Sequence, residues 1–221
     1  MRGDVKKPYL EIAGRPILHH TIERFQRTPG CGEIVLVVHP AEHADGALAD
    51  ELRDLFGVEK VVAGGGVRRE SVLNGLEATD AALQTVLIHD GVRPNVRREV
   101  VLEVVRQVQE HGAAIAAVPA TETVKVVDRA NRIEDTPDRS ELWFARTPQG
   151  FRRELILEAH RRAAREDYNC TDDAQLVEWL GGEVVVVQDD YENIKITTPS
   201  DLLLAEALLA EAGESGGNGT V

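Results

Sequence analysis

Short apolar runs recur along this chain, each separated from the next by enough residues for a helix, and this alternation limits the folds available to it. The clearest runs are residues 33–38, 59–62, 86–88 and 113–118. Runs of this length bounded by Gly or Pro are typical of buried strands. Strands that alternate with helical segments favour a parallel sheet covered by helices on both faces. We therefore predict an α/β fold with a mostly parallel, twisted sheet.

The residues between and after these runs have the apolar spacing or the capping residues of helices. Pro16 and Pro199 suit the first position of a helix. Thr171, Asp172 and Asp173 carry side chains that cap helix starts, and we expect them to do so here. We predict helices at residues 16–27, 42–56, 96–110, 152–165 and 199–212, a helix that ends at residue 180, and late strands at 183–187 and 193–196.

The chain is acidic, with a formal net charge of −13. This balance argues against a broad nucleic-acid-binding face and against binding to anionic membrane surfaces. No apolar run reaches transmembrane length, and the first residues lack the apolar segment of a secretion signal. The two cysteines, Cys31 and Cys170, provide no disulfide framework and fit a reducing compartment. We expect a cytoplasmic protein that binds neither nucleic acid nor membrane.

The stretch VLIHDGVRP, residues 86–94, places charged groups directly after a predicted strand. In open α/β sheets the carboxyl ends of the strands face the ligand crevice. Asp90 can offer oxygen to Mg²⁺, and Arg93 can bind a phosphate through two N–H groups. Alternatively, Asp90 only caps the turn and the side chain of Arg93 is solvated. The stretch is therefore a candidate site for a metal-bound, anionic substrate.

A second candidate is the strand, glycine-rich turn and helix around residues 59–76. Gly64, Gly65 and Gly66 precede Arg68 and Ser71, which would lie at the start of the helix. Glycines let backbone N–H groups approach a ligand closely, and a helix start attracts anions. The pattern matches neither a P-loop nor a dinucleotide fingerprint. A plain glycine turn is thus the alternative to an anion site.

Residues 121–141 depart from the alternation of strands and helices. They have short alternating segments, a polar turn and many charges, which indicates a β-hairpin that leaves the sheet. An arm of this kind usually packs on another subunit. We expect one domain over residues 1–212, this β-arm within it, and a disordered Gly/Ser-rich tail at 213–221.

Six motifs, in this order, resemble the family of 2-C-methyl-D-erythritol 4-phosphate cytidylyltransferases. They are KKPYLEIAGRPIL, GGGVRRESVLNGL, VLIHDGVRP, DRSELWFARTPQGF, TDDAQLVEWLG and NIKITTPSDLLLAEALL. The resemblance covers residues 1–209. It implies a Rossmann-like nucleotidyltransferase fold, a homodimer with an exchanged β-arm, and a Mg²⁺-dependent transfer of CMP from CTP to methylerythritol phosphate.

The resemblance also implies a role for each matching residue. Lys7 would bind the triphosphate, and Asp90 would hold Mg²⁺ and the nucleotide. Lys195 would orient the phosphate of methylerythritol phosphate for attack. Cytidine would bind at Gly65, Gly66, Arg68 and Ser71, and methylerythritol phosphate at Arg93, Thr147 and, across the dimer, Thr123 and Arg139. No general base is needed because a phosphate oxygen is already a nucleophile, so we expect His89 to be structural.

The match leaves three points open. Lys6 competes with Lys7 for the role of the family lysine, although Lys7 has the better spacing to Tyr9. The family pattern begins with an apolar strand and a Gly-rich loop that ends in Arg-Met, and Met1 aligns with that Met, so we expect upstream codons to encode them. The alternatives are a cytidylyltransferase for another polyol phosphate, such as ribitol 5-phosphate, and a non-catalytic relic.

Overall fold

A computed structural model describes residues 6–215, with side chains described up to residue 211. Its α-helices are α1 (Ile17–Gln26), α2 (Pro40–Ala44), α3 (Gly46–Phe56), α4 (Arg68–Ala78), α5 (Arg98–His111), α6 (Arg153–Arg165), α7 (Ala174–Trp179) and α8 (Pro199–Ser215). Its strands are β1 (Glu11–Ile12), β2 (Arg15–Pro16), β3 (Val35–Val38), β4 (Lys60–Ala63), β5 (Thr85–Ile88), β6 (Ala113–Pro119), β7 (Val126–Val127), β8 (Ile133–Asp135), β9 (Trp143–Arg152) and β10 (Val185–Gln188). Two 3₁₀ turns are η1 (Lys7–Tyr9) and η2 (Arg139–Glu141).

The main sheet has four strands in the order β10-β6-β9-β5. β10 is parallel to β6, whereas β9 is antiparallel to both β6 and β5. It follows that β5, β6 and β10 share one direction and that β9 alone opposes them. β3 and β4 form a separate parallel pair. The prediction of a mostly parallel sheet in an α/β fold is confirmed.

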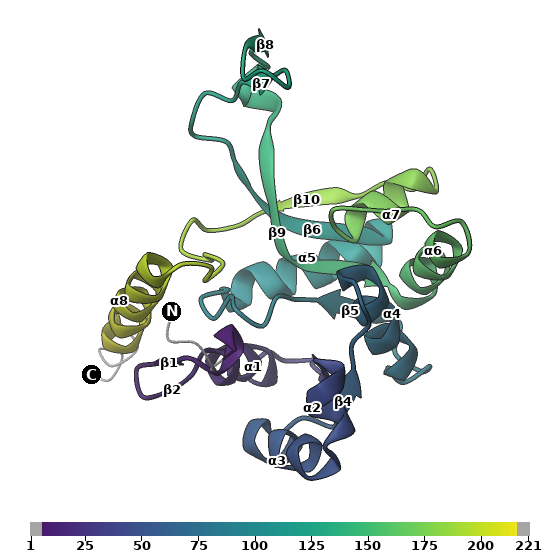
Figure 1. Cartoon of the computed structure of the whole chain (residues 1–221), viewed down its shortest axis with the longest axis vertical. Coiled ribbons are helices and arrows are strands. Elements are labelled where there is room, and N and C mark those ends of the chain that lie inside the picture. Colours follow the sequence, from purple (N-terminus) through teal and green to yellow (C-terminus); the bar gives the residue numbers. More distant parts are fainter. Residues whose placement is uncertain (1–5, 216–221) are drawn as a thin grey trace.

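Helices cover both faces of the main sheet, as predicted (Figure 1). On one face Val104 and Val108 of α5 pack with Ala114 and Ala116 of β6. The small alanine side chains let this helix lie close to the strand. The other face carries a larger apolar cluster that β6 and β9 share with α4, α6 and α7, including Ile115, Phe151, Ile156, Ala159 and Leu176.

Helix α4 joins the two sheets. Its Gly75 lies so close to β3 that a Cβ there would be 2.8 Å from Cγ2 of Val37. The next residue, Leu76, belongs to the apolar cluster under the main sheet. The glycine-rich turn that precedes α4 follows the carboxyl end of β4 and is bonded to β3, where the N–H of Gly64 donates to the carbonyl of Val38 at 2.7 Å.

Several predicted boundaries are wrong. The single helix expected at residues 42–56 is two helices, because the side chain of Asp45 accepts a hydrogen bond from the N–H of Leu48 and starts a new helix. Pro16 precedes its helix and pairs with Glu11 in a small hairpin. Residues 193–196 are not a strand. They form an irregular segment, in which the N–H of Ile196 donates to the carbonyl of Val92 at 3.0 Å.

The arm predicted at residues 121–141 is an extension that projects from the body (Figure 1). β7 and β8 pair antiparallel at its tip. Helix α8 continues to Ser215, so residues 213–215 are helical instead of disordered. Residues 216–221, the rest of the expected tail, lie outside the described residues.

We predict that Gly150→Ala lowers the free energy of unfolding by about 1–3 kcal/mol, as overpacking in a core usually does. A Cβ at Gly150 on β9 would lie 2.7 Å from Cγ1 of Val104 on α5 and 2.8 Å from Cδ2 of Leu87 on β5. Urea denaturation measures the effect. Gly32→Ala is the matched control, because its Cβ would meet Leu83 at an ordinary 3.6 Å. Equal stability of the two variants would contradict this account of the packing.

Candidate functional site

Asp90 lies just beyond the carboxyl end of β5 and receives two cationic side chains on one oxygen. Its Oδ2 accepts a hydrogen bond from Nε of Arg93 at 3.2 Å, and it lies 3.1 Å from Nζ of Lys195. Arg93 is on the same loop, whereas Lys195 comes from the irregular segment before α8. The fold thus brings together three of the residues that the sequence singled out.

Hydrogen bonds connect Asp90 and Arg93 to two further residues. The N–H of Asp90 donates to Oγ1 of Thr147 on β9 at 3.1 Å. Nδ2 of Asn193 donates to the carbonyl of Thr147 at 2.9 Å. Nη1 of Arg93 donates to the carbonyl of Asn193 at 2.8 Å. Together with the contact between Arg93 and Asp90, these bonds close a ring of four residues.

The electrostatics keep Asp90 charged. Burial alone would raise the pKa of this carboxyl, but Lys195 and then Arg93 favour the charged form, and the pKa lies below its ordinary value. Burial lowers the pKa of the neighbouring His89 to about 4. Nε2 of His89 donates to the carbonyl of Arg93 at 3.1 Å, and its ring packs on Phe25. A neutral His89 that holds this loop fits the structural role expected for it.

The two N-terminal lysines point to different partners. Nζ of Lys7 donates to the carbonyl of Thr197 at 3.0 Å, two residues from Lys195. Nζ of Lys6 lies 3.0 Å from a carboxylate oxygen of Glu42 on α2. Lys7 is therefore the lysine that contacts the segment carrying Lys195.

In the glycine-rich turn, two backbone N–H groups donate hydrogen bonds to side chains of α4. The N–H of Gly65 donates to Oγ of Ser71 at 3.0 Å, and that of Gly66 donates to Oε2 of Glu70 at 2.7 Å. A Cβ at Gly65 would collide with Cβ of Glu70. The turn needs glycine because its backbone crosses the first turn of its own helix.

Arg68 at the start of α4 binds a buried carboxylate. Its Nη2 lies 2.6 Å from Oδ2 of Asp173, whose side chain is fully buried. Oδ1 of Asp173 is 3.1 Å from Nε2 of His160, also fully buried. The expected capping role of Asp173 is therefore wrong, because its carboxylate joins α4 to α6. Asp172 does cap α7, through a hydrogen bond from the N–H of Gln175 at 3.0 Å.

Thr123 and Arg139 do not reach this site within one chain. Both lie in the arm, where Arg139 donates to the carbonyl of Thr121 at 2.8 Å and Thr123 is exposed. Among the described residues, neither contacts Asp90, Arg93 or Lys195. Figure 1 shows the arm extending away from the body.

Three residues near the site were not singled out from the sequence, although all lie inside quoted motifs. Asn193 opens the NIKITT stretch and belongs to the ring described above. Nη1 of Arg146 donates to the carbonyls of Asp190 at 2.7 Å and Asn193 at 3.0 Å. Oε1 of Gln149 accepts from the N–H groups of Asp173 and Ala174 and so fixes the start of α7. The sequence signal that could have identified these three residues was a polar side chain inside a predicted core strand or turn.

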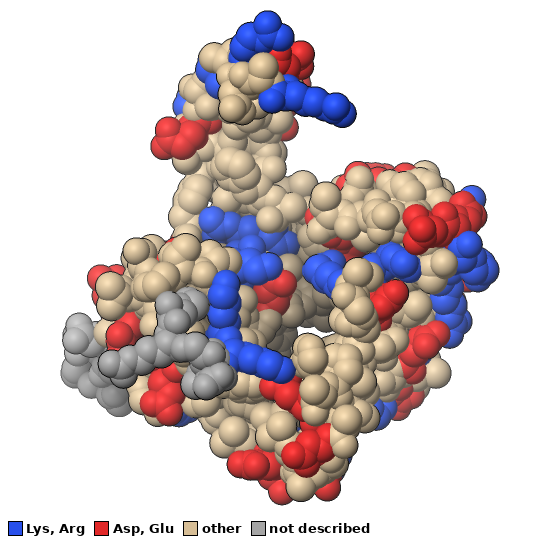
Figure 2. Space-filling view, in the orientation of Figure 1, with Lys and Arg blue, Asp and Glu red and all other residues tan. Residues whose placement is uncertain are grey.

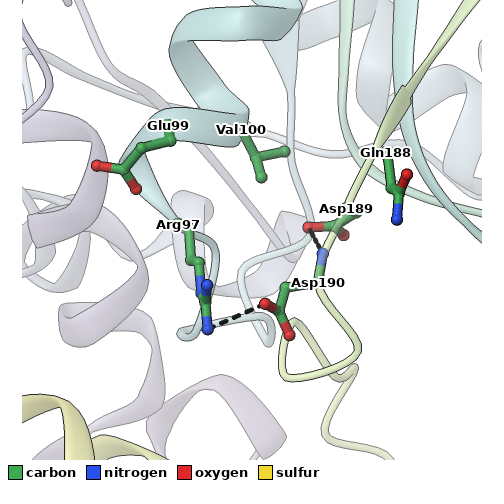
Figure 3. Close-up of a pocket in the computed structure, with 6 residues that line it drawn as sticks. All are labelled: Arg97, Glu99, Val100, Gln188, Asp189 and Asp190. Carbon is green, nitrogen blue, oxygen red and sulfur yellow. Dashed lines mark hydrogen bonds and ion pairs between the residues drawn. The ribbon is translucent and has the colours of Figure 1, made fainter.

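The lining of a cavity of about 470 Å³ includes none of Asp90, Arg93 and Lys195. Figure 3 shows the residues that line it. It is bounded by the start of α5 and the end of β10, and Arg97 there pairs with Asp190 at 2.9 Å. Its lining residues are Arg97, Glu99, Val100, Gln188, Asp189 and Asp190. Among the described residues, no group of three or more His, Cys, Asp or Glu side chains could hold a metal ion by itself.

Positive charge gathers in the middle of one face of the body. In Figure 2, Lys and Arg side chains surround a hollow there, in a protein whose net charge is −13. Such local concentration of cations suits an anionic ligand. In the described part of the chain, no helix is long and apolar enough to cross a membrane.

The comparisons with known proteins agree with one another. The sequence model of a family described as 2-C-methyl-D-erythritol 4-phosphate cytidylyltransferase matches residues 1–211. The enzyme of that name from Syntrophotalea carbinolica is 45% identical over 218 residues, which are 97% of this chain and 92% of the relative. The one from Geobacillus kaustophilus is 46% identical over 215 residues, 95% of this chain and 91% of the relative.

Solved structures give the same result. The 4-diphosphocytidyl-2C-methyl-D-erythritol synthase of Anaerococcus prevotii superposes with a TM-score of 0.83 at 32% identity, covering 93% of this chain and 90% of that one. The 2-C-methyl-D-erythritol 4-phosphate cytidylyltransferase of Thermus thermophilus gives a TM-score of 0.78 at 33% identity, covering 92% and 94%.

We predict that Asp173→Asn lowers the free energy of unfolding by about 1.5–3 kcal/mol at pH 7, because it removes a buried carboxylate that is bonded to His160 and to the partly exposed Arg68. Burial alone would raise the pKa of Asp173. The bonds with His160 and Arg68 lower it by more, so its folded-state pKa lies below the ordinary value. The stabilisation is therefore present above the unfolded-state pKa and is lost as the pH falls through the folded-state pKa. Urea denaturation of both proteins from pH 7 downward should show their difference shrinking in acid. A difference independent of pH would contradict the assignment.

Proposed function

The chain belongs to the 2-C-methyl-D-erythritol 4-phosphate cytidylyltransferase family, and on this premise we propose that Asp90, Arg93 and Lys195 form the centre of its active site. It is a nucleotidyltransferase that transfers CMP from CTP to methylerythritol phosphate and releases pyrophosphate. The expectation of an enzyme rather than a relic is confirmed. The relatives and structures reported above are named for methylerythritol phosphate, which favours it over ribitol 5-phosphate.

The reaction requires two anions to meet, since a phosphate monoester attacks the α-phosphate of a triphosphate. Their repulsion has to be offset by fixed positive charge, which provides most of the catalysis in phosphoryl-type transfer. The observation that supports our proposal is the convergence of Lys195 and Arg93 on Asp90, at 3.1 and 3.2 Å. When substrate arrives, these cations can exchange their contacts with Asp90 for contacts with phosphate oxygens.

We assign the remaining roles from the family motifs and from positions in the fold. Lys195 orients the attacking phosphate, and Lys7, which contacts the same segment, binds the triphosphate. The turn after β4 would receive cytidine through Gly65, Gly66, Arg68 and Ser71. For this the backbone N–H groups of the turn would have to release Ser71 and Glu70. Methylerythritol phosphate would bind at Arg93 and Thr147 and at Thr123 and Arg139 of a second subunit.

Asp90 fits the requirements of Mg²⁺. The ion is usually bound by one or two carboxylates together with substrate phosphates, with waters completing its shell. Both cations contact Oδ2 of Asp90, and within the described residues its Oδ1 has no hydrogen-bond partner. A bound Mg²⁺ would supply charge neutralisation to the phosphates of CTP. This chain's contribution is a carboxylate that stays ionised beside two cations.

The enzyme is proposed to act as a homodimer in which the arm completes the partner's site. The arm exposes apolar side chains, with Val126, Val127 and Ile133 between 43% and 63% exposed. Such a cluster on a protruding hairpin is typical of an interface. Thr123 and Arg139 lie on this arm, far along the chain from Asp90. In a dimer they would contribute to the active site of the partner subunit.

We also propose a cytoplasmic location for the reaction. Cys31 and Cys170 are both free thiols. Free cysteines without a disulfide framework are usual in reducing compartments.

Lys195→Ala should lower turnover with methylerythritol phosphate by roughly 10²–10³, the usual loss for one positioned charge, and leave CTP binding nearly unchanged. Asp90→Ala should weaken CTP binding itself, and added Mg²⁺ should partly restore it. Steady-state kinetics of the natural enzyme with both substrates varied, together with CTP titrations, separate the two effects.

Lys60→Ala is the matched control. Lys60 also pairs with a carboxylate, Glu33 at 2.6 Å, and its side chain is 42% exposed against 46% for Lys195. It lies on β4, so turnover should be unchanged. A Lys195→Ala enzyme within about twofold of the parent would refute the assignment.

Shared sites can be tested by mixing two inactive variants, Lys195→Ala and Arg139→Ala. If Arg139 serves the partner's site, each mixed dimer holds one intact site, and co-expression should restore roughly a quarter of the parent activity. No recovery would show that Arg139 acts in the site of its own chain.

The dimer itself can be tested with Ile133→Glu at the tip of the arm. Light scattering should find the parent as a dimer and this variant as a monomer. Leu55→Glu is the control, because Leu55 is similarly exposed, at 51%, but lies on α3 at the opposite end of the molecule (Figure 1). A dimeric Ile133→Glu protein would count against the arm as the interface.

A further inference from the structure

We propose that Asn193 is a positioning residue for this reaction, because its buried side chain fixes the segment from which Lys195 reaches Asp90. The inference rests on the proposed role of Lys195. Asn193 itself lies too deep to touch substrate, with no exposed surface. It would act only through the ammonium two residues further along the chain.

The segment that carries Lys195 has little regular structure of its own. Residues 189–198, between β10 and α8, contain no helix or strand. A stretch of this kind samples many conformations unless side chains hold it. Lys195 is 46% exposed, so its own packing restrains it weakly. Buried Ile196, whose N–H donates to the carbonyl of Val92, holds the segment on one side of Lys195, and a further contact has to hold it on the other side.

The side chain of Asn193 provides this restraint. Its Nδ2 donates to the carbonyl of Thr147 at 2.9 Å and to Oδ2 of Asp189 at 2.7 Å. The first bond ties the segment to β9, and the second ties it to the residue after β10. Both acceptors are in buried residues, at 5% and 6% exposure. Loss of the amide would leave two buried acceptors without this donor, which is costly.

The backbone of Asn193 adds a second set of contacts. Its carbonyl accepts from Nη1 of Arg93 at 2.8 Å and from Nη1 of Arg146 at 3.0 Å. Two guanidinium groups therefore meet at one oxygen, with the carboxylate of Asp189 close to Asn193. Asn193 is thus held through its backbone as well as through its side chain, and both sets of contacts fix the segment that carries Lys195.

These contacts complete the ring that joins Asp90, Thr147, Asn193 and Arg93. Asn193 is the only ring member on the segment of Lys195. The ring fixes both ends of the contact between Lys195 and Asp90. A misplacement of about 1 Å at a catalytic group can cost on the order of 10² in rate. Asn193 therefore needs no contact with substrate to matter for turnover.

The test is a double-mutant cycle with Lys195. In the parent enzyme, Asn193→Ala should lower kcat/KM for methylerythritol phosphate by at least about tenfold and change CTP affinity by less than about twofold. In the Lys195→Ala enzyme the same substitution should change the residual rate by less than about threefold, because the ammonium that Asn193 positions is already gone. Equal fold losses in both backgrounds would overturn the proposal.

Two controls separate positioning from general damage. Asn95 is also buried, at 8% exposure, and its amide has no hydrogen-bond partner among the described residues. Asn95→Ala should leave the rate unchanged, although it lies two residues from Arg93. Asn193→Asp keeps the shape of the side chain and removes its donors. If Asn193→Ala does not fold, Asn193→Asp takes its place in the double-mutant cycle. A parent-like rate for Asn193→Asp would also overturn the proposal.

The outcome also distinguishes this inference from the proposed function. If Lys195→Ala retained parent activity, the assignment of Lys195 would fail and this inference would fail with it. If Lys195→Ala lost its activity and the substitution of Asn193 lowered the rate by the same factor in both backgrounds, only the positioning role of Asn193 would be wrong. Melting temperatures of all variants, with assays run well below them, ensure that each rate refers to folded protein.

Discussion

The contact of one carboxylate with two cations is the feature on which the rest of the proposed active site depends. Asp90 stands at the carboxyl end of a strand, and Arg93 and Lys195 approach the same oxygen from different parts of the chain. Burial of Asp90 would favour its neutral form, and the two cations reverse that preference. The result is a charged, preorganised centre that needs no acid–base group. His89 beside it is neutral and serves the loop.

This arrangement also explains how an acidic protein can bind two anionic substrates. The net charge of −13 is spread over the whole chain, whereas the cations gather around one hollow (Figure 2). At physiological salt, charges separated by more than about 8 Å are largely screened from each other. Only the local set therefore decides what binds. Outside that set, many cations pair with carboxylates, as Lys60 does with Glu33.

The fold depends on a second buried charge in the same way. Asp173 joins Arg68 of α4 to His160 of α6, and Gln149 of β9 holds the start of α7 against it. The turn that we propose for cytidine is thereby fixed to the main sheet. Motifs that lie more than a hundred residues apart in the chain meet around one carboxylate. Their sequence signals looked like ordinary caps and turns.

The sequence by itself determined the α/β class, most of the helices and strands, the arm and the family. Periodicity and glycine placement suffice for the fold class and its elements because they reflect local geometry and burial, whereas the family followed from the resemblance of six motifs. Only the tertiary structure decided which polar residues meet: Asp173 is an ion-pair partner instead of a cap, residues 193–196 form no strand, and Asn193 is tied to Thr147. Contacts between distant residues depend on how whole elements pack. No local pattern encodes such contacts, so the ring around Asp90 emerged only from the packed fold.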